Sequence, residues 1–339
     1  MTSPLKSFHS SQRRTWAHAL LASVCIGPLA SLAFAQDAAW PTPGKPVRIV
    51  VPFPAGSGSD GLARTIARKL SEDTGGNFIV DNKPGAGTLI GAQDVARAAN
   101  DGHTLLYTIV VTHTQNPHLY SKLPYDPFKD FTPITQVARS ATVLVVNKDS
   151  PFNSVRDMVN FARSNPGKLN FASFSQGSTS HLNAEMLMMR SNTQMVHVPY
   201  KGTPDATRAL IAGDVQFYFD GTATAVEGAK GGRFKLLAVA ADKRLSVLPD
   251  LPTMTEAGIE GIDIVGWQGF FAPGNMSPAL SKKISDAMSR ALKSTEVSQM
   301  IINQGNEVSG AGPEEFARIV KRDHERWGAV IKRLNIKLD

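Results

Sequence analysis

The sequence predicts an α/β fold of two lobes, and three observations lead to this. The chain has 339 residues, more than one hydrophobic core usually organises. Short apolar runs alternate with amphipathic stretches of helical spacing over residues 47–109, and this alternation resumes over residues 142–240. Further strand and helix patterns follow residue 250, so the chain can cross to a second lobe and return, which is typical of hinged proteins.

The first unit is expected to pair strands with helices. Strands are predicted at residues 47–52, 78–81 and 104–109, and helices at 59–70 and 89–98. In the first helix, Leu62, Ile66 and Leu70 have the spacing of one buried face. Strands that alternate with helices imply a mostly parallel sheet covered on both faces. The proline-rich stretch from Pro117 to Pro133 is expected to be irregular.

The second unit repeats this order. Strands are predicted at residues 142–146, 169–172, 195–198, 215–219 and 234–240, with helices after Ser154, from Ser178 and after Thr203. A turn-rich segment at 248–252, a strand at 265–271 and two long helical stretches ending at Leu334 complete the chain. We therefore assign residues 36–138 and 251–339 to lobe one and 139–250 to lobe two.

The N-terminus has the pattern of a secretory signal peptide. Lys6, Arg13 and Arg14 precede an apolar run over residues 17–34, which is shorter than a membrane span, and cleavage is expected after Ala35. The twin arginines leave the export route open between the general secretory and the twin-arginine systems.

Composition excludes several classes of function. The only cysteine lies inside the signal segment, so the mature chain has no thiol for a disulfide, a metal or a nucleophile. The formal charge of +7 falls to +4 when the signal is removed. This dispersed excess gives no support to nucleic acid binding but favours a small anionic ligand.

Catalytic motifs are not found in the sequence. It has no Gly-x-Ser-x-Gly elbow and no His-Glu-x-x-His pattern, and its histidines are irregularly spaced. A serine nucleophile at Ser178 with His181 would need both on one helix, three residues apart and without a third partner. We therefore expect no enzymatic activity, no cofactor and no metal.

Two glycine- and serine-rich loops join a strand to a helix, at residues 52–60 and 173–181. Their glycines permit close backbone approach, and Ser59 or Asp60 can cap the first helix. Unpaired N–H groups at such a helix terminus bind anions. One such loop in each lobe predicts a ligand with two carboxylates.

A competing interpretation concerns the first loop. Gly56-x-Gly58-x-x-Gly61 follows a strand and opens a helix, and Asp81 ends the next strand, which matches the dinucleotide-binding fingerprint. This alternative is an NAD(P)-dependent oxidoreductase. Pro52 and Pro54 lengthen the turn, and export to a compartment without nicotinamide argues against it.

Seven segments carry a family resemblance: Trp40-Pro, Lys45-Pro-Val-Arg-Ile-Val-Val-Pro-Phe-Pro-Ala-Gly, Val80-Asp-Asn-Lys-Pro-Gly-Ala-Gly87, Leu123-Pro-Tyr-Asp-Pro, Pro166-Gly-Lys-Leu-Asn-Phe-Ala-Ser173, His197-Val-Pro-Tyr-Lys-Gly202 and Leu248-Pro-Asp-Leu-Pro-Thr253. Together they resemble the substrate-binding receptors of tripartite tricarboxylate transporters, the Bug family. The resemblance implies a two-lobed periplasmic-binding-protein (Venus-flytrap) fold with the ligand in the inter-lobe cleft. It also implies a periplasmic receptor that passes an organic acid to a membrane permease. We expect this receptor to be a monomer. A solute sensor for a signalling partner would share this fold.

The resemblance also suggests ligand-binding residues. The first loop contributes Phe53 as a wall, the backbone of Ala55, Gly56, Ser57 and Gly58, and Asp60. The second contributes Ser173, Phe174, Gln176, Gly177, Ser178 and His181. Thr112 and Asp220 follow strands that face the same cleft. Asp220 either receives an ammonium group or caps the next helix, the interpretation that we favour, and His181 either meets a carboxylate or bonds within the helix terminus.

The second loop departs from the family pattern, because Phe174 and Ser175 replace small residues. A ring at this position predicts an aromatic dicarboxylate such as phthalate or terephthalate, contacted by Phe53 or Phe174. The alternatives are an aliphatic or amino diacid, with Phe174 packed away from the ligand. Trp267 is expected to pack at the crossing between the lobes rather than in the site.

Overall fold

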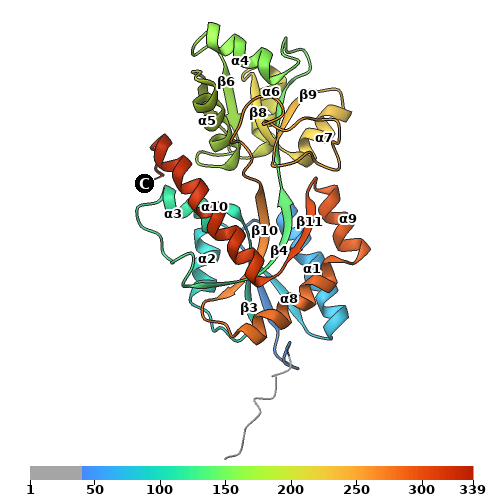
Figure 1. The fold of residues 1–339 in the computed structure, drawn as a ribbon. Helices are drawn as coiled ribbons and strands as arrows, with labels where there is room; N and C mark the ends of the chain where they lie inside the picture. The colour runs from blue at the N-terminus through green and yellow to red at the C-terminus, as the bar shows by residue number, and fades with distance from the viewer. Residues whose placement is uncertain (1–39, 339) are drawn as a thin grey trace, which may run out of the picture. The chain divides into compact units, whose positions relative to one another are not determined.

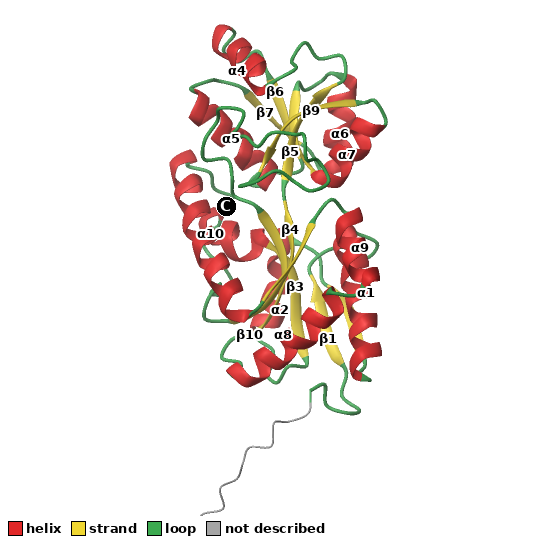
Figure 2. Cartoon of the chain, turned by 45° about the vertical axis from the view of Figure 1, so that its right-hand side comes forward, coloured by secondary structure: helices red, strands yellow, loops and turns green. Residues whose placement is uncertain are grey.

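The computed structural model describes residues 40–338, which lie in one compact unit. The expected signal peptide, with its cysteine and its cleavage site, lies outside these residues. Within them, no helix is both long enough and apolar enough to cross a membrane. Two separate sheets, each flanked by helices, organise the chain (Figures 1 and 2).

The sheet of lobe one has six strands in the order β11-β4-β10-β3-β1-β2. Its strands are β1 (Val47–Val51), β2 (Phe78–Asn82), β3 (Thr104–Ile109), β4 (Phe131–Ser140), β10 (Gly266–Pro273) and β11 (Glu307–Ala311). The helices that accompany them are α1 (Gly58–Thr74), α2 (Leu89–Ala96), α3 (Asn116–Leu119), α8 (Pro278–Leu292), α9 (Thr295–Asn303) and α10 (Pro313–Leu334), with short turns η1 (Ala86–Thr88) and η2 (Val111–Gln115). β1 pairs in parallel with β2 and β3, whereas β10 is antiparallel to β3 and β4.

The sheet of lobe two has five strands in the order β7-β6-β8-β5-β9. Its elements are β5 (Thr142–Asn147), α4 (Val155–Ser164), β6 (Asn170–Ser173), α5 (Thr179–Ser191), β7 (Val196–Pro199), α6 (Thr203–Ala212), β8 (Phe217–Gly221), α7 (Thr222–Lys230) and β9 (Phe234–Ala240). β5 is antiparallel to both of its neighbours. Both sheets are therefore mixed, which corrects the prediction of mostly parallel sheets.

Strand β4 is the main element that the sequence did not predict. It runs through Pro133 and continues almost directly into β5, so it forms the first crossing between the lobes. Pro133 sits at a shift in the register with β10, where a residue without an N–H interrupts the ladder least. The predicted irregular stretch therefore ends before Phe131.

The C-terminal part also differs from the prediction of two helical stretches. It contains three helices, and β11 separates α9 from α10. The last helix connects the two lobes, because Trp327 and Ile331 of α10 belong to one buried cluster that includes Phe271 of lobe one and Phe171 of lobe two (Figure 1).

Candidate ligand-binding site

A pocket of about 340 Å³ lies between the two sheets and takes its lining from both lobes. Val110, Phe174 and Trp267 form much of its apolar wall. The rest of the described lining consists of uncharged groups, chiefly threonine hydroxyls and the carboxamides of Gln268 and Gln304. A ligand that binds here meets no basic or acidic side chain of the lining itself.

Three helices of lobe two begin at this pocket. Thr179, Thr203 and Thr222 are the first residues of α5, α6 and α7, and each of them lines the pocket. Each helix follows a strand, so its N-terminus lies where open sheets bind ligands. The unpaired N–H groups and the helix dipoles place partial positive charge there, which favours an anion.

The first loop is held by Asp60. Its carboxylate accepts hydrogen bonds from Gly56 N (2.9 Å), Asn82 Nδ2 (2.9 Å) and Arg64 Nε (3.1 Å). Burial by itself would raise the pKa of Asp60, but the bonds from Arg64, Gly56 and Asn82 lower it below the usual value. Asp60 therefore fixes the loop through bonds within the chain.

The cap of α1 is Ser57, not Ser59 or Asp60 as predicted. Ser57 Oγ accepts from Asp60 N, and the helix begins at Gly58, one residue earlier than expected. Gln304 connects this loop to the pocket, because its Nε2 donates to Gly58 O at 2.9 Å. Phe53, Ala55 and the rest of the first loop do not line the pocket in the described structure.

The second loop is held by His181. Ser178 caps α5, and Gly177 N donates to His181 Nδ1 at 3.1 Å. The imidazole is 5% exposed and stacks on His197 with ring centroids 3.8 Å apart. With Nδ1 accepting, the proton resides on Nε2, which lies 3.4 Å from Glu185 Oε1. The structure thus places His181 as a support of the loop.

Behind this loop, His197 Nε2 lies 2.7 Å from Ser173 Oγ, and Ser173 Oγ donates to Ser175 O. Because that hydroxyl has one proton, His197 is the donor to Ser173. Burial, followed by the neighbouring His181, lowers the pKa of His197 to about 4. The ring therefore stays neutral over most of the physiological pH range.

Only one of the predicted ligand-binding residues belongs to the lining of the pocket. Phe174 lines it, while Gly177 packs closely against Leu119, and Gln176 is exposed on the loop. Thr112 is placed elsewhere: it is fully buried in η2, where its hydroxyl bonds to Thr88 and Thr108.

Asp220 lies next to the pocket, one residue before the lining Gly221. Its Oδ1 accepts from Gly221 N at 2.7 Å, and its Oδ2 has no partner among the described residues. Burial raises the pKa of Asp220 to about 6. The predicted capping role is wrong, because Gly221 is the N-cap of α7 and no side chain caps this helix.

Sequence reasoning missed several lining residues. Trp267 forms a wall of the pocket as well as part of the crossing strand β10, which corrects its expected exclusion from the site. Thr142 and Gln268 also line it. A signal was available in the threonines that open α5, α6 and α7, since each follows a strand.

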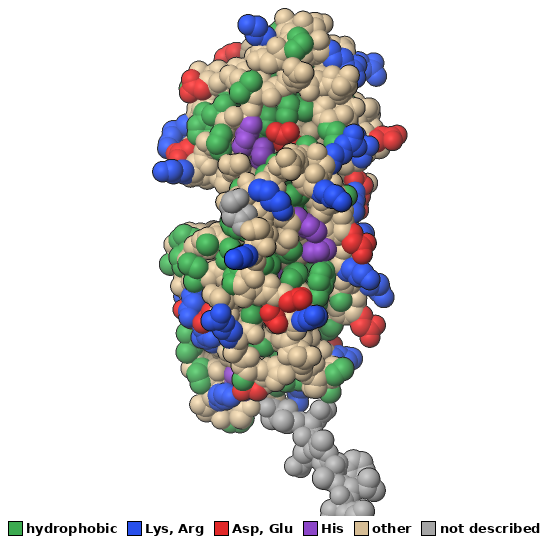
Figure 3. All heavy atoms as spheres, turned by 90° about the vertical axis from the view of Figure 1, so that its left-hand side faces the viewer, with side chains coloured by type: hydrophobic (Ala, Val, Ile, Leu, Met, Phe, Trp, Pro, Cys, Tyr) green, Lys and Arg blue, Asp and Glu red, His purple; other side chains and the backbone are tan. Residues whose placement is uncertain are grey.

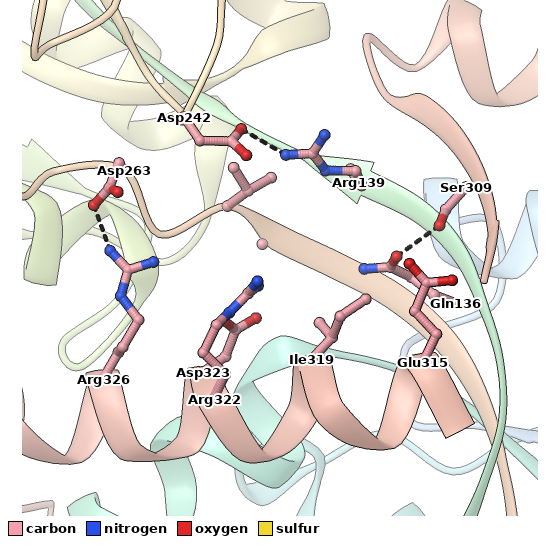
Figure 4. Close-up of a pocket in the computed structure, with 12 residues that line it drawn as sticks. Gln136, Arg139, Asp242, Asp263, Ser309, Glu315, Ile319, Arg322, Asp323 and Arg326 are labelled. Atoms are coloured by element: carbon pink, nitrogen blue, oxygen red, sulfur yellow. Dashed lines mark hydrogen bonds and ion pairs between the residues drawn. The ribbon is translucent and has the colours of Figure 1, made fainter. Parts of the chain in front are cut away.

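A second cavity, of about 270 Å³, lies beside the crossing strands and α10 (Figure 4). It is strongly charged: Arg139 pairs with Asp242 at 2.6 Å, and Arg326 pairs with Asp263. Burial raises the pKa of Asp323, whose Oδ2 has no partner among the described residues. The arginines are neutralised by nearby carboxylates, so this hinge cavity is a poorer anion site than the uncharged pocket.

The dinucleotide fingerprint has a structural role at its acidic end. Asp81 pairs with Arg48 at 3.1 Å, and Arg48 also pairs with Asp94.

Positive and negative side chains are interspersed over the face shown in Figure 3. Over residues 40–338, no group of three or more metal-ligating side chains is placed to hold an ion.

Comparison with known proteins agrees with this geometry. Residues 62–336 match the family model described as the tripartite tricarboxylate transporter family receptor. A Pseudomonas sp. (strain P51) protein of the UPF0065 group, from the tcbD-tcbE intergenic region, is 36% identical over 85% of this chain and 86% of its own length. BugT of Bordetella pertussis is 29% identical over 87% of this chain and 91% of its own.

Solved structures show the same fold. An R. palustris protein with adipate is 32% identical, covers 88% of this chain and 100% of its own, and has a TM-score of 0.77. MatC from Rhodopseudomonas palustris with bound malate is 32% identical over 85% and 99% of the two chains, with a TM-score of 0.73. The periplasmic binding protein BugD has a TM-score of 0.74 at 31% identity, over 87% and 100%. The chain belongs to the family of tripartite tricarboxylate transporter receptors, which are two-lobed, solute-binding proteins of the Bug type.

Proposed function

We propose that this receptor captures a small organic dicarboxylate in the pocket between its two sheets. The observation that carries this proposal is the convergence of three helix N-termini, at Thr179, Thr203 and Thr222, on a pocket with an uncharged lining. Backbone N–H groups and hydroxyls stabilise an anion there without a salt bridge. Relatives solved with adipate and malate support this ligand class.

An aromatic diacid, such as terephthalate or phthalate, is the proposed ligand within this class. Phe174 and Trp267 both line the pocket, and Val110 adds apolar surface. A flat ring between such walls gains stacking contacts beyond its buried area. An aliphatic diacid would use the same helix ends but would leave the two aromatic side chains with fewer contacts.

A thermal-shift panel on residues 36–339 tests this proposal. The panel contains terephthalate, phthalate, adipate, malate, aspartate and NAD(P)H, because a ligand that binds only the native state raises the melting temperature. We expect the largest shift with an aromatic diacid, and a smaller shift in Trp267→Ala. Shifts with adipate or malate alone would replace the aromatic ligand by an aliphatic one, and no shift with any diacid would contradict the proposed function.

Delivery and location complete the proposal. After export and cleavage following Ala35, the receptor would work as a periplasmic monomer that hands its ligand to a tripartite tricarboxylate transporter permease. Family membership supports this role. N-terminal sequencing of the secreted protein tests the cleavage, and loss of diacid uptake when this receptor is deleted, with its permease intact, distinguishes transport from sensing.

A further inference from the structure

Two threonine hydroxyls of the pocket are held from behind by buried carboxamides. Gln115 Nε2 donates to Thr179 Oγ1 at 3.1 Å, and Asn183 Nδ2 donates to Thr142 Oγ1 at 2.8 Å. Thr142 and Thr179 line the pocket, whereas Gln115 and Asn183 are 0% and 1% exposed. The carboxamides therefore contact the threonines and not the ligand.

This arrangement fixes the direction of each hydroxyl proton. A threonine hydroxyl has one proton and two lone pairs. Since the amide N–H occupies the oxygen from the buried side, the proton is left to point toward the pocket. Gln115 Oε1 and Asn183 Oδ1 have no partner among residues 40–338, so neither of them takes the proton back.

From this geometry we infer that Gln115 and Asn183 are positioning residues that make Thr179 and Thr142 hydrogen-bond donors to the ligand. The side of the pocket at the start of α5, named here the donor side, is defined by Thr142 and Thr179. A carboxylate accepts hydrogen bonds and cannot donate them. The donor side therefore holds a carboxylate of the ligand, an inference that rests on the proposed function and adds the residues that orient the site.

The start of α7 provides the contrast. Thr222 Oγ1 donates to Ala141 O and Thr224 Oγ1 donates to Gly221 O, both at 3.0 Å. Their protons are committed to backbone carbonyls, so these hydroxyls have only lone pairs to offer. The five threonines of the pocket thus differ in polarity. The fifth, Thr203, resembles the donor side because Tyr218 OH donates to it at 3.5 Å.

Gln115 adds a link to lobe closure. It belongs to η2 of lobe one, whereas Thr179 belongs to α5 of lobe two. Their hydrogen bond exists only while the two lobes are together, so the donor side is completed by closure. Contacts made only in the closed state are those that allow a ligand to shift the equilibrium toward it.

The closing experiment measures Kd by isothermal titration with terephthalate and adipate, for the wild type and matched variants. Thr142→Val and Thr179→Val each remove a donor, and we expect an affinity about ten-fold weaker, because hydrogen bonds to charged groups are strong. The control is Thr74→Val, because Thr74 donates to Leu70 O within α1 and lies outside the pocket, and its affinity should remain within about two-fold of the wild type. Equal losses in all three variants, or none in any, would overturn the inference.

Asn183→Asp tests the positioning role separately. Its carboxylate cannot donate, so the Thr142 proton turns back toward it, and we expect about ten-fold weaker binding than wild type at pH 8. Near pH 5 the introduced buried carboxyl is protonated and donates again, so affinity relative to wild type should recover. Asn183→Leu should weaken binding with no such dependence on pH. A ratio to wild type that stays constant across pH in Asn183→Asp would contradict the role.

Gln115→Glu repeats this test from lobe one, in case Asn183→Asp does not fold, and thermal melts of each variant verify folding. The outcomes separate the two proposals. A wild type that binds neither diacid contradicts the proposed function and this inference together. A wild type that binds a diacid, with unchanged affinity in the threonine and carboxamide variants, contradicts this inference alone.

Discussion

Residues 56–60 in lobe one and 177–181 in lobe two fold into almost the same structure around different acceptors. In each, a glycine with φ of +81° or +73° precedes a serine N-cap with φ of −70°, and the glycine N–H donates to a side chain four residues later. That side chain is the anionic Asp60 in the first loop and the neutral imidazole of His181 in the second. The backbone of the loop requires only an acceptor at this position, so its charge is free to vary.

The difference in charge matches the position of the pocket. Asp60 is neutralised by Arg64, and the first loop does not line the pocket. His181 supports the loop that leads into α5, whose first residue does line it. A carboxylate at position 181 would place a negative charge behind an anion site, whereas a neutral ring leaves the helix terminus favourable to an anion. Lobe two therefore keeps the support of its loop uncharged.

Removal of Asp60 should produce the largest effect. Asp60→Ala leaves Gly56 N–H and Asn82 Nδ2 without their acceptor, and we expect the free energy of unfolding to fall by about 3 kcal/mol. Denaturant unfolding at pH 7 measures this. The control is Asp157→Ala, because Asp157 likewise accepts from the backbone N–H four residues before it, that of Asn153, but in an exposed position. A similar loss in both variants would show that burial does not set the strength of this contact.

The stability of the first loop should also depend on pH. Since hydrogen bonds lower the pKa of Asp60 in the folded state, its contribution is present above the unfolded pKa of about 3.9 and is lost as pH falls through the lower folded value. Asp60→Asn should therefore lose less stability than wild type between pH 5 and pH 2. Parallel curves for the two proteins would contradict this.

Asp220 tests whether lobe two tolerates negative charge near the pocket. Its folded pKa of about 6, raised by burial, lies above the unfolded value, so its contribution is greatest below the unfolded pKa and is lost as pH rises through 6. As pH rises from 4 to 8, we expect the free energy of unfolding of Asp220→Asn to increase relative to that of wild type by about 2 kcal/mol. Chemical denaturation across this pH range measures the difference. Diacid affinity at pH 8 should increase as well. If Asp220→Asn instead loses affinity for an amino diacid alone, then Asp220 binds the ammonium group of that ligand.

His181 should give a smaller effect that a conservative variant reverses. His181→Ala leaves the buried Gly177 N–H without an acceptor, at a cost of about 1–2 kcal/mol and weaker diacid binding. His181→Asn places an oxygen close to the position of Nδ1 and should restore most of the stability. Equal losses in the two variants would show that the stack on His197, and not the acceptor, supports this loop.

The smallest expected effect concerns His197. Because burial lowers its folded pKa to about 4, the unfolded chain binds its proton first, and stability falls as pH drops from about 6.5 to 4. His197→Phe keeps a ring in the stack but removes this titration. We expect the melting temperature of the variant to decrease less than that of wild type between pH 7 and pH 4.5, by about 2–4 °C. Identical decreases would contradict the assignment.

The sequence predicted the parts of the fold that depend on local pattern. β1 and β3 are apolar runs and α1 has apolar residues at helical spacing, and both loops were located between a strand and a helix. β4 escaped detection because its apolar residues mix with Thr132, Pro133 and Gln136, and a strand whose two neighbours supply its burial needs no strong alternation. Its position depends on β10 and β11, which come much later in the chain.

The site was predictable only where its helices start, because its other contacts join residues that are far apart in the chain. The bond from Gln115 to Thr179 spans 64 positions, and that from Asn183 to Thr142 spans 41. No local pattern indicates that these side chains meet. Trp267 was likewise identified with the crossing strand, but its inclusion in the pocket wall depends on how α5, α7 and β10 pack together.

The position of the ligand is tested most directly by a diffraction study of residues 36–339, crystallised with the diacid that gives the largest thermal shift. The chain offers two cavities near the crossing strands, one uncharged at the helix ends and one charged beside α10. We predict one carboxylate at the starts of α5, α6 and α7, within hydrogen-bond distance of Thr142 and Thr179. A diacid bound instead in the hinge cavity, beside Arg139 and Arg322, would contradict the proposed binding site.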